Sequence, residues 1–108
     1  MIDYITGRIA ELTPAYIIID NGGIGWFANI SLTTYSRLEG KTECKLLVHE
    51  VIREDSHQLY GFSDREEREM FRLLITVSGV GAATARMMLS SLTHHELEKA
   101  ILSADVNI

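Results

Sequence analysis

The sequence predicts an α+β fold, in which a small antiparallel β-barrel is followed by a segment of three helices. Within the first sixty of the 108 residues, five or six short runs are rich in β-branched and aromatic residues, which is typical of a closed or partly closed barrel. Beyond Ser63, apolar residues recur at helical spacing, and two Ser/Thr-x-x-Glu patterns indicate helix N-termini. This change divides the chain into a barrel domain at 1–62 and a helical domain at 63–108.

Turn-forming residues separate the predicted strands. Residues 21–23 (Asn-Gly-Gly) tolerate the positive φ of a tight hairpin, and residues 55–56 (Asp-Ser) provide a second turn. Gly7 is expected to bend or bulge the first strand. Residues 32–40 break the strand pattern, and we expect a loop with a short helical turn there. The strands are expected at residues 2–12, 15–20, 24–30, 43–53 and 57–62.

Three helices are expected in the second domain. The first begins at a capping box, in which the Ser63 hydroxyl accepts a hydrogen bond from the Glu66 amide, and Thr93 with Glu96 repeats this pattern at the third. Residues 79–81 interrupt the chain between the first and second helices. The positions at helical spacing are Phe71, Leu74, Ile75 and Ser78 in the first helix, Ala85, Met88, Leu89 and Leu92 in the second, and Leu97, Ala100 and Ile101 in the third.

Composition and charge limit the classes of function. The chain is 46% hydrophobic and 23% charged, which is typical of a globular protein rather than a disordered one. Its 15 Asp and Glu outnumber 10 Lys and Arg, and the net charge of −5 speaks against indiscriminate binding to DNA or an anionic membrane. Nucleic acid is not excluded, because backbone amides at a helix N-terminus bind phosphate even on an acidic protein.

The chain also shows the features of a cytoplasmic protein. Its one cysteine, Cys44, excludes an internal disulfide and a Cys-rich zinc site, and fits a reducing compartment. No apolar stretch approaches the length of a membrane span, and Asp3 stands where a signal peptide needs basic residues. We therefore expect a soluble protein of the cytoplasm that does not bind membranes.

The most informative motif is Gly79-Val80-Gly81 between two short helices. In a helix–hairpin–helix, the first glycine adopts a conformation closed to other residues and the apolar middle residue packs between the helices. The second glycine lets a phosphate approach the first amides of the next helix. A turn in which the glycines have no role beyond its shape explains the local pattern equally well. The candidate phosphate-binding residues are Ser78, Gly79, Val80, Gly81, Ala82, Thr84 and Arg86.

Four arginines near this motif either add phosphate contacts or pair with neighbouring glutamates on a solvated face. The arginines are Arg65, Arg68, Arg72 and Arg86, and the glutamates are Glu66, Glu67 and Glu69. For Arg65 and Arg68 we favour pairing with the glutamates. For Arg86, one turn into the second predicted helix, both interpretations stay open.

No catalytic, cofactor-binding or metal-binding site is expected. Glu54 and Asp55 lie in a predicted turn, where acidic residues are usually solvent-exposed, and the spacing brings no third carboxylate to them. Trp26, Phe27 and Tyr60 have the chemistry to stack on bases, but packing in a barrel core is the commoner use. The histidines lack metal-ligand spacing and are interpreted as structural or surface residues. They are His49, His57, His94 and His95.

Several motifs occur together in one order along the chain. The start Met-Ile-x-Tyr-Ile-x-Gly (1–7), Asn-Gly-Gly-Ile-Gly-Trp (21–26) and Thr-Thr-Tyr (33–35) precede Val-Ile-Arg-Glu-Asp-Ser-His-Gln-Leu-Tyr-Gly-Phe (51–62). Phe-Arg-x-Leu-Ile-x-Val-Ser-Gly-Val-Gly (71–81) follows in register. With these motifs the chain resembles the RuvA family of bacterial Holliday-junction branch-migration subunits, from its start to about residue 105.

The resemblance implies an oligonucleotide-binding (OB) barrel at 1–62, a first helix–hairpin–helix, and no enzymatic activity of the chain itself. It further implies a homotetramer that holds a four-way DNA junction open and square. Glu54 and Asp55 occupy the place of the family's acidic pins at the tetramer centre, where carboxylates repel phosphates and disfavour continuous duplex. The implied partners are four-way junction DNA, a RuvB-type hexameric ATPase and a RuvC-type resolvase.

Two departures from the family pattern change these expectations. Ala82-Ala83 stands where the family commonly has Pro-Lys, so one cationic contact is missing and Arg86 is the candidate to replace it. The chain ends at Ile108, where the family's second hairpin, of Gly-Ile-Gly-Lys type, begins, ahead of a linker and a motor-binding domain. We therefore expect a fragment of a longer protein, which binds DNA weakly and does not recruit the motor.

Three other functions stay open. A general OB module would bind single-stranded nucleic acid through barrel aromatics, with quenching of Trp26 and without a tetramer. A nuclease or glycosylase of the helix–hairpin–helix kind would need a catalytic Asp, Lys or metal cluster, which the sequence pattern does not provide. A pure interaction domain would use the glycines only to shape a turn.

Overall fold

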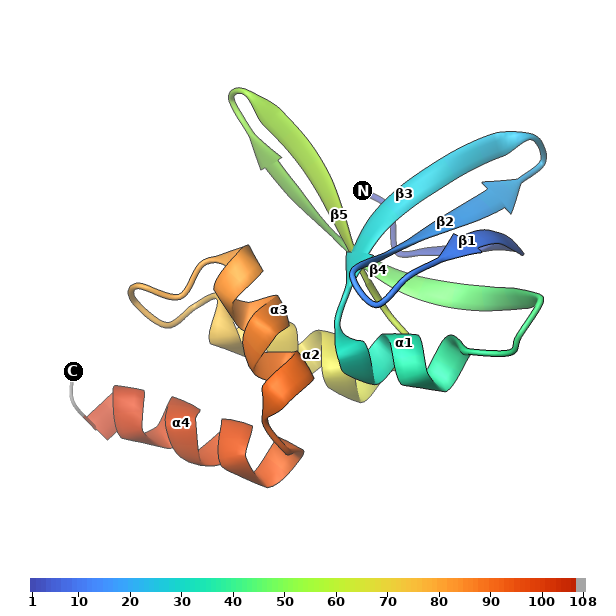
Figure 1. The fold of residues 1–108 in the computed structure, drawn as a ribbon. Coiled ribbons are helices and arrows are strands. Elements are labelled where there is room, and N and C mark those ends of the chain that lie inside the picture. The colour runs from blue at the N-terminus through green and yellow to red at the C-terminus, as the bar shows by residue number, and fades with distance from the viewer. Residues whose placement is uncertain (107–108) are drawn as a thin grey trace.

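Five strands in the N-terminal part of the chain close into a barrel in the order β1-β2-β3-β5-β4. The computed structural model, which describes residues 1–106, shows this barrel above three helices of the C-terminal part (Figure 1). The strands are β1 Tyr4–Leu12, β2 Tyr16–Asn21, β3 Ile24–Ile30, β4 Glu43–Arg53 and β5 Ser56–Phe62. This strand order in a five-stranded barrel is that of an OB-fold, so the predicted fold class is confirmed.

One seam of the barrel differs from the prediction. Strands β3 and β5 pair in parallel, with Asn29 opposite Tyr60 and Ile30 opposite Gly61, whereas the other four pairings are antiparallel. The wholly antiparallel barrel was therefore wrong at this seam. Strands β4 and β5 form a hairpin, so β5 runs opposite to β4 and must meet β3 in parallel to close the barrel.

Gly7 does not mark a bulge, since the register between β1 and β2 shifts between Ile9 and Glu11 instead. The glycine is required by a close approach of the two strands. A Cβ atom at this position would lie 2.4 Å from the carbonyl oxygen of Asp20. Gly7 therefore lets β1 pass close to β2 at the point where they cross.

Helix α1 (Leu32–Leu38) lies between β3 and β4, where a loop with a short helical turn was expected. Ser31 begins the helix, because its hydroxyl accepts a hydrogen bond from the Thr34 amide at 3.1 Å. Leu38 is buried in the barrel core, and Thr34 is buried with its hydroxyl bonded to Glu67. Figure 1 shows α1 between the barrel and the C-terminal helices.

The C-terminal helices are α2 Arg65–Leu74, α3 Ala82–Ser91 and α4 His94–Val106. Asp64, not Ser63, begins α2, since its carboxylate accepts from the Glu67 amide at 2.8 Å; an ionised oxygen is the stronger acceptor. The second capping box is confirmed, with reciprocal bonds of 3.2 and 3.0 Å between Thr93 and Glu96. Helix α2 ends four residues before Ser78, and no described helix is long and apolar enough to cross a membrane.

Two apolar cores hold the molecule together. One fills the barrel, and the other joins strands β4 and β5 to the C-terminal helices. Phe71 of α2 is at the centre of the second core, fully buried and 5.2 and 5.1 Å from the rings of Tyr60 and Phe62. The division of the chain at residue 62 stays a prediction, and this second core crosses it. Two predictions lie outside the described residues. They are the burial of the Ala100 side chain and the end of the helical domain at 107–108.

Candidate nucleic-acid interface

The loop between α2 and α3 is shaped by its two glycines. Gly79 has a φ of +84°, a conformation that L side chains rarely adopt, and no atom lies within 4 Å of an added Cβ. The glycine is therefore required by the backbone and not by lack of space. Val80, the apolar middle residue, is partly buried against the core of the helices, as predicted.

The N-terminus of α3 presents uncapped backbone amides. Gly81 is the N-cap residue, and a glycine has no side chain to accept from the amides of the first turn. Ala83 and Thr84 are exposed, but the Ala82 side chain is packed into the helical core. Any role of Ala82 in phosphate binding is therefore limited to its backbone amide.

A groove joins this loop to strand β4. It has a volume of about 330 Å³ and is lined on one side by residues 49–53 of β4, and on the other by Ile75, Val80, Gly81 and Ala82. The structure thereby brings the glycine loop beside the strand that leads to the candidate acidic pin. This proximity does not follow from spacing in the sequence, because about 30 residues separate the two walls.

Glu54 and Asp55 form the tip of the β4–β5 hairpin. Arg53 pairs with Ser56 across the turn, and both acidic residues are exposed. Figure 1 shows this hairpin extending from the barrel away from α4. Within residues 1–106 the structure brings together no cluster of three His, Cys, Asp or Glu side chains that could hold a metal.

Arg86, the one candidate cation of the hairpin, contacts the barrel. Its Nη1 atom donates a 2.9 Å hydrogen bond to the carbonyl oxygen of Ile30, and the residue is half-buried. At least one of its donors therefore has a structural partner. Five donors in a planar fork allow the same guanidinium to bind a second acceptor.

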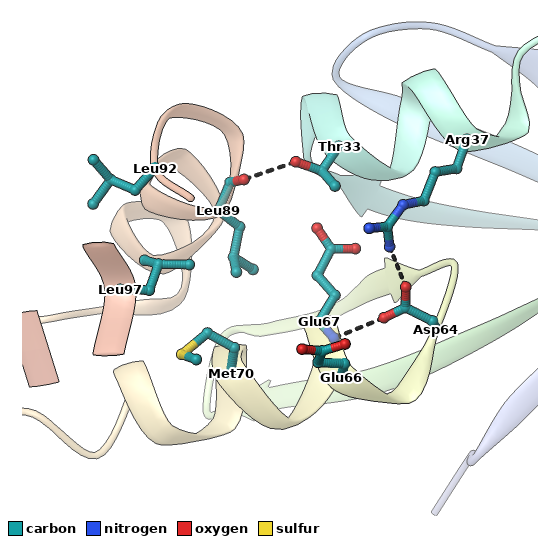
Figure 2. A pocket seen from close by; sticks show the side chains of 9 residues that line it. All are labelled: Thr33, Arg37, Asp64, Glu66, Glu67, Met70, Leu89, Leu92 and Leu97. Carbon is teal, nitrogen blue, oxygen red and sulfur yellow. Dashed lines mark hydrogen bonds and ion pairs between the residues drawn. The ribbon is translucent and has the colours of Figure 1, made fainter. Parts of the chain in front are cut away.

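A buried carboxylate on α2 was missed by the sequence analysis. The Glu67 side chain points from α2 toward α1 (Figure 2) and is 7% exposed. It accepts hydrogen bonds from Ser31 Oγ at 2.6 Å and from Thr34 Oγ1. Its spacing to Phe71 and Leu74 is i, i+4 and i+7, so the helical pattern already placed Glu67 on the buried face.

The barrel part of the chain matches a known family. A family model described as the RuvA N terminal domain covers residues 1–61, more than half of the chain. The chain belongs to the RuvA family. The resemblance drawn from the sequence motifs is thereby confirmed.

Curated relatives extend the match to the helices. A protein of Bacteroides fragilis is 55% identical over 108 residues, which is 100% of this chain and 54% of the relative. Proteins of Christiangramia forsetii and Porphyromonas gingivalis are 50% and 46% identical, over 98% and 99% of this chain and 55% and 53% of their own length. Each is named Holliday junction branch migration complex subunit RuvA. The chain spans about half the length of these relatives.

In this RuvA-family chain Arg68 does not lie on a solvated face. It is buried, and its Nη1 donates to the Asp3 carbonyl at 2.8 Å, to Asp3 Oδ1 at 2.9 Å and to the Val48 carbonyl at 3.3 Å. The predicted pairing with neighbouring glutamates was therefore wrong for Arg68. The guanidinium thereby ties α2 to β4 and to Asp3, the residue before β1.

Arg72 and His49 form a second contact between α2 and the barrel. Arg72 Nε lies 3.2 Å from His49 Nδ1, and its Nη1 lies 3.6 Å from Glu69 Oε1. Burial lowers the pKa of His49, and the positive charges of Arg72 and Arg68 lower it further against the opposing effect of Glu50. His49 is therefore a neutral structural residue at neutral pH, as interpreted from the sequence.

The aromatic residues divide between core and surface. Trp26 is partly buried against the barrel core, as expected. Tyr60 is buried as well, but in the core between the barrel and the helices, where it stacks on Phe71. Phe27 is 50% exposed and stacks on Tyr16 at 4.8 Å between ring centroids, so the expectation of core packing was wrong for this residue. Neighbouring residues on a strand face opposite sides, which places Phe27 outside the barrel when Ala28 is inside.

Proposed function

We propose that the chain is the DNA-binding part of a non-catalytic scaffold that binds four-way junctions during branch migration. The observation that carries the proposal is the shared groove between β4 and the glycine loop. It places the uncapped amides at the start of α3 beside the strand that leads to the turn of Glu54 and Asp55. The names of the relatives, each a Holliday junction branch migration complex subunit, support the same conclusion.

The two features act on DNA in opposite ways. In the proposed helix–hairpin–helix, the amides after Gly81 bind backbone phosphates, which needs no cationic side chain and is compatible with the net charge of −5. Glu54 and Asp55 repel phosphates at the hairpin tip. In a homotetramer the two carboxylates of each of four chains give eight at the centre, which disfavours continuous duplex there and favours separated strands at a crossover.

The partners follow from the scaffold role. We propose a homotetramer of the chain in the cytoplasm, a RuvB-type hexameric ATPase that hydrolyses ATP, and a RuvC-type resolvase as a further partner. We place the contact with the motor outside residues 1–108. This chain needs no cofactor for the proposed role, because binding and opening a junction involves no covalent chemistry.

A general module for single-stranded nucleic acid is the second candidate function. The exposed Phe27 ring, stacked on Tyr16, offers an aromatic surface to an unpaired base. A groove of about 330 Å³ beside it is lined by residues of β3 and β5, including Trp26 and His57. This function predicts a preference for single strands over both junction and duplex.

A three-way competition titration tests the two candidates. A labelled four-way junction, a linear duplex of equal arm length and a single strand compete for the chain at two salt concentrations, because phosphate-dominated affinity depends on salt. If the chain is the proposed scaffold, it should bind the junction more tightly than the duplex at both salt concentrations. Preference for the single strand, with quenching of Trp26, would instead establish the second candidate.

A further inference from the structure

Buried polar side chains gather where the barrel meets the helices. Among the described residues, four polar or charged side chains are buried, and they are Ser31, Thr34, Glu67 and Arg68. Ser31 and Thr34 belong to the start of α1, while Glu67 and Arg68 belong to α2. Each of the four has a hydrogen bond to the other side of this boundary. The buried polar contacts therefore serve the joint between the two units.

Glu67 is the shared acceptor of two of these contacts. Its two carboxylate oxygens accept from Ser31 Oγ and Thr34 Oγ1. Each hydroxyl oxygen also accepts a hydrogen bond from a backbone amide. Ser31 Oγ accepts from the Thr34 amide at 3.1 Å, and Thr34 Oγ1 accepts from the Ser63 amide at 3.3 Å. The carboxylate thus holds the end of β3, the start of α1 and the start of α2 in one directional network.

Two hydrogen bonds connect helix α1 to α3. Thr33 Oγ1 donates to the Leu89 carbonyl at 2.9 Å, as Figure 2 shows, and the Leu32 amide donates to Ser90 Oγ at 3.0 Å. The small cavity between α1, α2 and α3 has Glu67 on its wall. The residues around Glu67 therefore contribute to the angle between the glycine loop and the barrel, together with the bond from Arg86 to the Ile30 carbonyl.

A buried carboxylate is less favourable than an apolar side chain if the contact between the barrel and the helices serves stability alone. Desolvating an ionised group is unfavourable, and an apolar side chain of similar volume is often neutral or stabilising at such a position. Directional hydrogen bonds offer what apolar packing does not, since they fix one geometry among several of similar packing. The position of Glu67 on the face of Phe71 and Leu74 makes an apolar residue the default there.

We propose that Glu67 is a positioning residue, which fixes the angle between the barrel and the α2–α3 loop and thereby aligns the phosphate-binding amides with the acidic tip of the β4–β5 hairpin. The proposal rests on the proposed function for its effect on DNA. Its effect on the angle stands on the geometry alone. The two parts are therefore tested by separate readouts.

The first readout is the distance between the β4–β5 hairpin and the start of α3, measured in the absence of DNA. Spin labels at Ser56→Cys and Thr84→Cys, both exposed positions, report this distance in a Cys44→Ser background, with labelled chains diluted into unlabelled ones. Glu67→Met keeps the volume and removes the hydrogen bonds, so the distance distribution should broaden or shift. Glu67→Gln keeps an acceptor and should preserve the distribution. An unchanged distribution in the folded Met variant would overturn the proposal.

The second readout is the preference for a junction over duplex. In Glu67→Met this preference should fall at least about fivefold, the lower end of typical coupling between two sites, while duplex affinity and thermal stability are kept. Glu69→Ala, an exposed carboxylate on the same helix, controls for the loss of one negative charge. A stable Met variant with wild-type preference contradicts the role in alignment. No junction preference in the wild type would contradict the proposed function and leave the distance result to decide on Glu67.

Should Glu67→Met fail to fold, Thr34→Val removes one of the two hydroxyl donors at constant shape. The same broadening and loss of preference are expected, to a smaller extent because Ser31 still donates. Wild-type values for both readouts in this variant would overturn the proposal.

Discussion

The Nη1 atom of Arg86 lies 2.9 Å from the carbonyl oxygen of Ile30, which ties α3 to the last residue of β3. The guanidinium thus stands at the boundary between the barrel and the helices, a few residues after the uncapped amides of Gly81 and Ala82. The bond to Ile30 leaves other N–H donors of the guanidinium able to bind a second acceptor. The contact with Ile30 differs from the pairing with neighbouring glutamates that the sequence left open, while the phosphate contact stays a prediction that mutation tests.

Arg86→Ala should lower the free energy of unfolding by about 1.5 kcal/mol, because a hydrogen bond from a charged donor to a half-buried carbonyl is lost. It should also weaken junction binding and reduce the slope of log affinity against log salt by roughly one. Urea unfolding and a salt titration measure the two effects. Arg65→Ala, at an exposed position, is the control for lost charge. A changed stability with an unchanged salt slope would make Arg86 purely structural.

Gly79→Ala should destabilise the fold by about 1–2 kcal/mol, since the φ of +84° is unfavourable for any residue with a Cβ. Because no atom lies within 4 Å of the added Cβ, the effect is confined to the backbone of the loop. Gly81→Ala is the matched control, as its φ of −87° is open to all residues. Thermal unfolding should therefore separate the two variants.

The same pair tests phosphate binding. Gly81→Ala places a methyl group beside the first amides of α3, and we expect weaker binding to both junction and duplex with a smaller loss of stability than in Gly79→Ala. Fluorescence anisotropy with both DNAs measures this. Undiminished binding by Gly81→Ala would show that the glycines only shape a turn.

Glu54→Gln combined with Asp55→Asn should leave stability within about 0.5 kcal/mol of the wild type, because both side chains are exposed. Duplex affinity should rise and the junction preference should fall by about tenfold, since repulsion at the hairpin tip is lost. The competition titration measures the ratio.

A control for the pin variant is Glu39→Gln combined with Glu43→Gln, which removes the same charge from exposed positions at the other end of β4. It should change the affinity for both DNAs alike. An equal effect of both double variants on the ratio would mean that net charge, and not the position of the pin, discriminates against duplex.

The strands could be predicted because runs rich in β-branched and aromatic residues lie between clear turn residues. Strand β4 was predicted with its observed bounds, and β5 begins one residue earlier than predicted. A loop with a short helical turn was expected at residues 32–40, and the full helix α1 was not, because seven residues of which four carry hydroxyl groups show little helical periodicity. Its stability comes from the Ser31 cap and from contacts of Thr33 and Thr34 with residues 33 to 56 positions away.

The candidate site was predictable as two separate motifs but not as one interface. Gly79-Val80-Gly81 and Glu54-Asp55 each follow from local pattern or from the family resemblance, while the groove between them depends on how α2 packs on β4. The residues that set this packing, Glu67 and Arg68, are charged and were assigned to the surface. The helical spacing of Glu67 to Phe71 and Leu74 already indicated burial, although charged residues are mostly exposed. The hydrogen-bond partners of Glu67 and Arg68 lie on other elements, which the sequence pattern does not identify.

The buried carboxylate of Glu67 should make stability depend on pH. Burial raises the pKa of this carboxyl above its ordinary value of 4.5, while hydrogen bonds from Ser31 and Thr34 and the charge of Arg37 oppose the rise and Asp64 adds to it. With a raised pKa, the folded state binds more protons than the unfolded state from pH 4.5 upward. The contribution of Glu67 to stability is therefore largest at low pH and is lost as the pH rises through the folded pKa.

Glu67→Gln removes this titration and keeps the network. The free energy of unfolding of the wild type minus that of Glu67→Gln should therefore decrease as the pH rises from about 4.5, and become constant once the carboxyl is ionised in both states. Urea unfolding of both proteins across this range measures the difference. For Glu69→Gln, whose carboxylate stays in water, the corresponding change with pH should be smaller. A difference that increases with pH would mean that the hydroxyl donors outweigh burial and hold Glu67 ionised in the folded protein.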